Sequence, residues 1–252
     1  MPAVIERALR EQAPNEEPAT PKVAQRAVGN VFRAVSAVRQ SRSVHPDGVV
    51  FEATFEVQRA NRCSAPIFGQ PGSKPAVVRL SRSIGLPQPL PDLLGCTIRL
   101  VDAHGPGRHQ DFPLITSSDR PLLHHLLLPA KSFLSLPYSS VLLYPIGEAV
   151  RLDGALPVTS PVGGGTDFDQ LHRTADQEQV AFDLAVASPF GRWRPIGRFS
   201  LGARVPVDIA ERIRFNPWNT GGGIRPMGPF MGLRAGAYRG SQEGWSVEGE
   251  GQ

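Results

Sequence analysis

Arg234 and Tyr238, near the end of the chain, have the residue types and the spacing that would let them bind an iron cofactor jointly. If this segment is helical, residues four apart lie on one face and can touch. A guanidinium is always charged, so it favours the ionised form of a neighbouring phenol. An ionised phenol can serve as an axial ligand of haem iron. The same pair also fits a surface contact or a tyrosine of the core.

Four other residues, His109, Asp111, His124 and His125, suggest a competing chemistry, that of a metal-dependent hydrolase such as a phosphodiesterase. His109 and Asp111 would share one face of a strand. His124 and His125 are adjacent, however, so on a helix their side chains diverge by about 100° and cannot both face one ion. No acidic cluster completes such a site.

The glycine-rich stretches Gly163–Gly165 and Gly221–Gly223 lack the context of a phosphate-binding loop, which needs a P-loop motif or a strand–GxGxxG–helix unit. We expect both to be turns. Cys63 and Cys96 have no zinc-ligand spacing, so a zinc site is not expected.

The elements that must position these residues are mostly strands. Alternation and β-branched or aromatic residues predict strands at Val49–Val57, Pro75–Arg82, Leu94–Asp102 and Asp111–Ser117. Further strands are predicted at Ser140–Tyr144, Gln177–Ser188 and Trp193–Val205. Their spacing and the Gly/Pro turns favour an antiparallel sheet curling toward a barrel. Arg79 and Ser81 alternate on one of these strands, so their side chains point to one face.

Helices are predicted around this barrel. They cover Ala3–Gln12, about residues 20–40, Arg120–Leu128, a turn at Pro206–Arg212, and Met227–Arg239, which carries Arg234 and Tyr238. Residues 129–166 contain five prolines between Pro129 and Pro161 and a glycine run, so regular structure there should be intermittent. The sequence thus predicts an α+β fold: an N-terminal helical arm over residues 1–40 and a barrel domain over residues 41–252. We interpret this arm as a packing element or as a homodimer contact.

Composition excludes several classes of protein. The chain has 252 residues, a net charge of +4, and 26 glycines and 25 prolines spread between apolar runs, which is typical of a turn-rich globular protein. Its basic residues are scattered, whereas a nucleic-acid-binding protein would gather them in one patch. The charged, amphipathic first residues are unlike a signal peptide, and no apolar run could span a bilayer. We therefore expect no nucleic-acid partner, no integral membrane segment and a cytoplasmic location.

Four blocks between about residues 41 and 239 give the chain a resemblance to the haem-dependent catalase superfamily. The first two are Arg42-Ser-Val-His45 and Val78-Arg79-Leu80-Ser81. The third is Asp92-Leu-Leu-Gly95 followed by Asp111-Phe-Pro113. The fourth runs from Pro195-Ile-Gly197 through Asn216-Pro-Trp-Asn219 to Arg234-Ala-Gly-Ala-Tyr238. They occur in the family's order and spacing.

The resemblance implies a minimal catalase-like or peroxidase-like core: an antiparallel β-barrel with a C-terminal proximal helix that binds haem b. By this resemblance Tyr238 is the axial iron ligand, held ionised by Arg234, and His45 is the distal catalytic residue, with Val44 beside it. Arg42 and Arg79 would pair with the propionates, and Ser81 would support His45. Histidine suits this role, since the reaction needs a base that moves a proton between the two oxygens of a peroxide.

The chain also departs from the family pattern. Where catalases have an asparagine two residues before the proline matching Pro113, this chain has Asp111, with Gln110 beside it. A one-residue slip would exchange the two. An ionised carboxylate cannot donate a hydrogen bond and would repel peroxide anion. Leu114 and Ile115 replace an aromatic pair, and the C-terminal helical domain of typical catalases is missing from the sequence.

These observations predict an enzyme that converts hydrogen peroxide or an organic hydroperoxide, with His45, Ser81 and Asp111 as catalytic residues. Peroxidase action or hydroperoxide rearrangement is expected rather than fast catalase turnover. The alternative is a haem-binding protein of the same fold without turnover, which Asp111 would favour. The metal-dependent hydrolase remains a further alternative.

Overall fold

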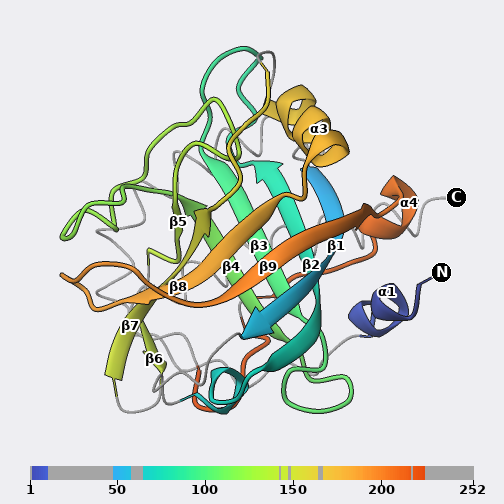
Figure 1. Ribbon diagram of the computed structural model, residues 1–252, viewed down its shortest axis with the longest axis vertical. Helices are drawn as coiled ribbons and strands as arrows, with labels where there is room; N and C mark the ends of the chain where they lie inside the picture. The colour runs from blue at the N-terminus through green and yellow to red at the C-terminus, as the bar shows by residue number, and fades with distance from the viewer. Residues whose placement is uncertain are drawn as a thin grey trace, which may run out of the picture.

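The computed structural model describes residues 2–10, 48–57, 65–141, 143–146, 149–163, 167–216 and 218–224. Nine strands form one sheet within these ranges (Figure 1). They are β1 (Gly48–Val57), β2 (Gly72–Arg82), β3 (Leu94–Leu100), β4 (Gln110–Thr116), β5 (Tyr138–Ser139), β6 (Tyr144–Ile146), β7 (Ala149–Pro157), β8 (Ala181–Ala187) and β9 (Arg194–Arg204).

The sheet closes on itself. Its order is β5-β4-β3-β2-β1-β9-β8-β7-β6, and an additional pairing joins β5 to β7. Eight of the described strands therefore make a closed antiparallel barrel, and β6 is paired to the outside of this ring through β7. The predicted antiparallel barrel is confirmed.

Short helical segments lie around the barrel (Figure 1). They are α1 (Ala3–Ala8), the 3₁₀ turn η1 (Pro66–Phe68), α3 (Asp167–Gln177) and α4 (Val207–Ala210). The predicted helix at Ala3–Gln12 and the turn at Pro206–Arg212 are confirmed in their described parts. In the part of the chain that the structure describes, no helix is both long and apolar enough to cross a bilayer.

The barrel interior is filled with apolar side chains. In β1 every second residue from Val49 to Val57 faces inward, as the alternating pattern predicts. Phe55 packs near Phe199, with ring centroids 6.2 Å apart, and Phe199 lies 6.1 Å from Phe182. Gly197 makes room for this packing, because a Cβ there would lie 2.4 Å from the Phe55 ring. The barrel is a packed scaffold, so ligand chemistry is expected on its surface.

A buried carboxyl group lies within this interior. Asp153 of β7 alternates with Ala155, pairs with Val186 of β8, and both of these neighbours belong to the interior core. Its side chain is 2% exposed and its Oδ2 has no hydrogen-bond partner. Burial raises the pKa of Asp153 to about 8.

The predicted helix at Arg120–Leu128 is wrong. The segment is a pair of tight turns, in which the Leu123 N–H donates to the Arg120 carbonyl and the Leu126 N–H donates to the Leu123 carbonyl. Pro121 and the left-handed backbone at Leu122 (φ 74°) prevent continuous helix. The apolar run that suggested a core helix is exposed at three of its leucines.

The region from 129 to 166 is more regular than predicted. It contains β5, β6 and β7. The predicted strand at Ser140–Tyr144 coincides with a strand only at Tyr144, where β6 begins, and β5 ends one residue before Ser140. Strand β7 was not predicted because it contains Asp153, Gly154 and the terminal Pro157, and all three residue types are uncommon in strands. Helix α3 was not predicted because its sequence is mostly polar. The predicted helices at residues 20–40 and 227–239, and the domain boundary at residue 40, lie outside the described residues.

Candidate functional site

The outer face of strands β1 to β4 carries every predicted site residue that the structure describes. Interior positions such as Val78 and Leu80 belong to the core, so the alternate residues of each strand face outward. Paired residues form three rows across this outer face: Gly48, Ser81, Gly95 and Ile115; Val50, Arg79, Thr97 and Pro113; Glu52, Val77, Arg99 and Asp111. We call these residues the β1–β4 outer face.

One end of the β1–β4 outer face is covered. Ile5 and Ala8 of α1 pack with Val50 and Val77, together with Val205 and Ile213. This apolar contact covers Val50 of the Arg79 row and Val77 of the Asp111 row, whereas the Ser81 row lies at the opposite side of the face. The structure therefore divides the face into a packed end and an end lined by small and polar residues.

Arg79 and Ser81 lie beside two glycines at that second end. A Cβ on Gly48 would lie 2.7 Å from a terminal nitrogen of Arg79, so the guanidinium crosses directly over this glycine. A Cβ on Gly95 would lie 3.0 Å from Ser81 Oγ. The two glycines thus make room for the Arg79 guanidinium and for the hydroxyls of Ser81 and Ser83, which lie directly over them.

One feature of this arrangement fits a group that carries carboxylates. A guanidinium binds a carboxylate through parallel hydrogen bonds. The propionates of haem are carboxylates of this kind. Arg79 is therefore compatible with a haem propionate at the end of the β1–β4 outer face that holds Ser81.

Asp111 is held in a buried ion pair. Arg99 Nε donates to its Oδ1 over 2.8 Å, and Arg99 Nη2 contacts its Oδ2 at 2.6 Å. The backbone N–H of Asn216 and the side-chain amide of Asn219 also donate to Oδ2, at 2.8 and 2.9 Å. Both oxygens are engaged, so the carboxylate ties the segment around Asn216 to the barrel. These contacts are those of a structural residue.

The Arg99 side chain extends this connection to the N-terminal helix. It donates to the Ala8 carbonyl over 2.7 Å and to the Arg214 carbonyl over 2.6 Å, and it lies 5.1 Å from the Phe215 ring centre. Sequence reasoning missed Arg99 because its partner Asp111 lies opposite it on the neighbouring strand. The only sequence signal was an arginine at an outward position of a strand.

Gln110, the alternative to Asp111, points to the other side of β4. Its Oε1 lies 3.0 Å from His104 Nε2 and accepts a hydrogen bond from the Gly221 N–H over 3.2 Å. The His104 ring lies against Gly221 and Gly222, which form a tight turn as predicted. Burial lowers the pKa of His104, which keeps its ring neutral. Gln110 therefore anchors a turn.

The residues of the hydrolase alternative do not come together as a metal site. The Asp102 N–H donates to His109 Nδ1 over 3.0 Å, and burial, followed by Arg99, lowers the pKa of His109. His124 and His125 each contact backbone carbonyls instead of a shared centre. Among the described residues, no three His, Cys, Asp or Glu side chains are grouped to hold a metal ion. The structure offers no support for this alternative.

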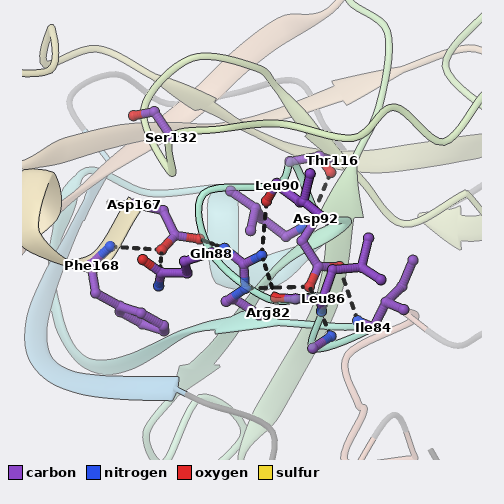
Figure 2. A network of polar contacts seen from close by, with 12 residues as sticks. Arg82, Ile84, Leu86, Gln88, Leu90, Asp92, Thr116, Ser132, Asp167 and Phe168 are labelled. Carbon is purple, nitrogen blue, oxygen red and sulfur yellow. Dashed lines mark hydrogen bonds and ion pairs between the residues drawn. The ribbon is translucent and has the colours of Figure 1, made fainter. Parts of the chain in front are cut away.

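A buried polar network lies next to Ser81 and was not predicted (Figure 2). Arg82 lies between Asp92, 3.3 Å from its Nε, and Asp167 of α3, which contacts its Nη1. Asp92 accepts hydrogen bonds from the N–H groups of Ile84, Gly85 and Leu86. The network fixes the loop after β2 and the start of α3, and so holds the strand end that carries Ser81.

Arg42, Val44, His45, Arg234 and Tyr238 lie outside the described residues. The structure therefore brings Arg79 and Ser81 together on the β1–β4 outer face, with Asp111 two rows from Ser81. The roles predicted for the other five residues stay predictions.

Solved structures with a similar fold are catalases. A fungal catalase matches with a TM-score of 0.59 and 12% sequence identity over 90% of this chain. A bacterial catalase matches with a TM-score of 0.56 and 12% identity over 95% of this chain. The chain covers 65% of the fungal protein, less than two thirds of its length, and 68% of the bacterial one. At this identity the likeness shows the fold alone.

No protein-family model matches the sequence, and no curated protein matches it. The catalase-like fold therefore rests on the shape of the barrel.

Proposed function

We propose that this chain is a haem-dependent enzyme that converts hydrogen peroxide or an organic hydroperoxide, acting as a peroxidase or as a hydroperoxide-rearranging enzyme. The observation that carries the proposal is the pair Arg79 and Ser81 on the outer face of a catalase-like barrel. The guanidinium of Arg79 suits a carboxylate-bearing cofactor. When bound, haem supplies the iron at which the peroxide O–O bond is cleaved.

The residues of this chain would bind the cofactor and move the proton. Arg79 and Arg42 would pair with the propionate carboxylates. Tyr238, kept ionised by Arg234, would hold the iron. His45 takes the proton from one peroxide oxygen and returns it to the leaving oxygen, and Ser81 orients its ring by a hydrogen bond. Asp111, whose oxygens are all engaged, holds the adjoining segment in place instead of touching peroxide.

One observation favours a second candidate, a haem-binding protein without turnover. Asp111 stands where the catalase pattern has an asparagine, and its carboxylate pairs with Arg99. Neither it nor Gln110, which bonds to His104 and Gly221, presents a donor to a peroxide on the β1–β4 outer face. Haem uptake without peroxide decay would select this candidate.

The test begins with the full chain purified with haemin supplied. We expect a ferric haem spectrum that changes in Tyr238→Phe, because its axial ligand is removed. Arg79→Leu should weaken haem binding about tenfold or more, as expected for loss of a charged hydrogen bond. His45→Ala should lower the rate of hydroperoxide conversion by about 10²–10⁴-fold with haem still bound. A protein that takes up no haemin would refute the proposal.

A matched pair of glycine variants tests the position of the site. Gly95→Val fills the row beside Ser81 and should abolish haem uptake while the far-ultraviolet circular dichroism stays that of the wild type. Gly202→Val on β9 is the control, since a Cβ there makes only ordinary contacts, 3.4 Å from the nearest atom. Equal haem uptake by both variants would place the cofactor elsewhere.

A further inference from the structure

Four large apolar side chains are exposed together on two loops that contact each other. Leu122 is 63% exposed, Leu123 42%, Leu126 50% and Phe190 72%. The leucines lie in the loop that follows β4, and Phe190 lies in the β8–β9 hairpin, which ends at the left of Figure 1. We call these four residues the Leu–Phe patch. Apolar side chains gathered in this way on a protein surface mark an interaction site.

His124 joins the two loops. Its Nε2 lies 2.8 Å from the Gly191 carbonyl oxygen and its Nδ1 lies 3.2 Å from the Ser118 carbonyl oxygen. Its ring also lies against the Trp193 ring, with centroids 4.5 Å apart and the two planes tilted by 50°. Gly191 directly follows Phe190 in the chain, so this contact holds Phe190 near the leucines on either side of His124. The two loops that carry the Leu–Phe patch are thus held against each other.

The leucine loop is fixed with its apolar side chains outward. The Ser118 N–H donates to the Leu126 carbonyl over 3.3 Å and closes the loop. Leu122 has a left-handed backbone (φ 74°), which is costly for a bulky residue. The loop therefore buries His124 and exposes its leucines, the reverse of what folding alone would favour. Such an arrangement suits a partner that receives the leucines.

Positive charge borders the patch. Arg120, Arg192 and Arg194 are exposed beside the apolar residues, and Asp119 is the one acidic residue within 119–126 and 188–194. The two loops therefore carry a net charge of +2 with histidines neutral. Leucine and phenylalanine side chains bordered by arginines match a membrane interface, where apolar groups enter the acyl region and cations meet anionic headgroups.

We propose that the Leu–Phe patch docks this protein reversibly on an anionic lipid surface. Four side chains at loop tips are few for a stable protein interface, which typically buries about 800 Å² on each partner. They are sufficient for a peripheral membrane contact, in which each inserted side chain adds its own transfer free energy. The proposal does not depend on haem binding, because the patch is built from other residues.

The test is flotation of the full-length chain with lipid vesicles. Vesicles of equal parts phosphatidylcholine and phosphatidylglycerol should bind the protein at low salt, and vesicles of phosphatidylcholine alone should bind it much more weakly. Added salt should release the protein from the mixed vesicles. Failure to float with the mixed vesicles at low salt would overturn the proposal.

Two pairs of variants locate the contact. The double variant Leu122→Ser/Phe190→Ser should bind mixed vesicles at least about tenfold more weakly, since two apolar groups are lost. Its control is Val158→Ser/Val207→Ser, which replaces two exposed valines elsewhere and should bind like the wild type. Arg192→Gln should weaken binding about fivefold, whereas Arg212→Gln, an exposed arginine near α4, should not.

The competing occupant is a second copy of this chain, which size-exclusion chromatography with light scattering distinguishes. A monomer that floats supports the lipid contact. A dimer that Leu122→Ser/Phe190→Ser converts to a monomer would assign the patch to self-association and overturn the proposal. Equal flotation by the wild type and this double variant would also overturn it, because the lipid contact would then lie elsewhere.

Discussion

Replacing Asp153 by asparagine should remove a pH-dependent loss of stability from the barrel. Asp153 is enclosed among interior residues, and burial raises its pKa from 3.8 to about 8. Between these values the folded protein keeps a proton that the unfolded chain has released. Stability therefore falls as the pH rises through this window and levels off above it.

The size of the effect follows from the shift. Each pH unit within the window costs about 1.4 kcal/mol, so wild-type protein carries a penalty on the order of 4 kcal/mol at pH 7. Asparagine has nearly the same shape and cannot ionise. The stability of Asp153→Asn relative to the wild type should therefore increase by about 3 kcal/mol between pH 5 and pH 7.

The assay is urea unfolding of both proteins at a series of pH values, followed by circular dichroism. Asp183→Asn is the control, because this carboxylate lies near the surface and is paired with Arg198. Its stability difference from the wild type should stay constant over the same range. A constant difference for Asp153→Asn as well would refute the reasoning, since it would mean that Asp153 is ionised inside the fold.

Two further substitutions test the packing around the barrel. Arg82→Met should lower the free energy of unfolding by about 3–5 kcal/mol, because it leaves two buried carboxylates without their cation. The control is Arg198→Met at a surface ion pair, which should cost about 1 kcal/mol or less. Equal losses for the two variants in urea unfolding would contradict the conclusion that the Arg82 ion pairs are buried. Gly154→Ala should cost about 1–3 kcal/mol, because its Cβ would lie 2.7 Å from the Trp193 ring and 2.8 Å from the Tyr138 carbonyl oxygen. Gly202→Ala should be close to neutral in the same urea unfolding, and a neutral Gly154→Ala would show that both the Trp193 ring and the backbone at Tyr138 can move aside.

The strands of the barrel could be predicted where side chains alternate strictly. In β1, apolar residues at every second position gave both the strand and its inward face. The rule failed at β7, which contains Asp153 and Gly154 and closes the barrel all the same. A different rule failed at Arg120–Leu128, where a leucine-rich run predicted a short helix. There, the contacts of His124 with a distant hairpin decide the conformation, and local sequence does not contain them.

The candidate site was predictable in part for a similar reason. Alternation alone placed Arg79 and Ser81 on one face, and the structure confirms that arrangement. Alternation does not reveal which strands become neighbours, so the Arg99–Asp111 ion pair, whose members are 12 residues apart, could not be anticipated. Asp111 was predicted to be catalytic because the sequence does not reveal its ion-pair and hydrogen-bond partners. The homodimer and the cytoplasmic location stay predictions.

The barrel is closed by a very short strand, β5. Only Ile115 and Thr116 of β4 pair with β5, and only Gly154 and Ala155 of β7 pair with it on the other side. This two-residue seam has fewer ladder hydrogen bonds than any full-length strand pair in the ring. It is the place where the cylinder should open first, so the amides of Tyr138 and Ser139 should exchange with solvent sooner than those of β2 or β3. An opened seam would leave the borders of β4 and β7 unpaired and able to join strands of another molecule, so thermal aggregation of this protein should begin there.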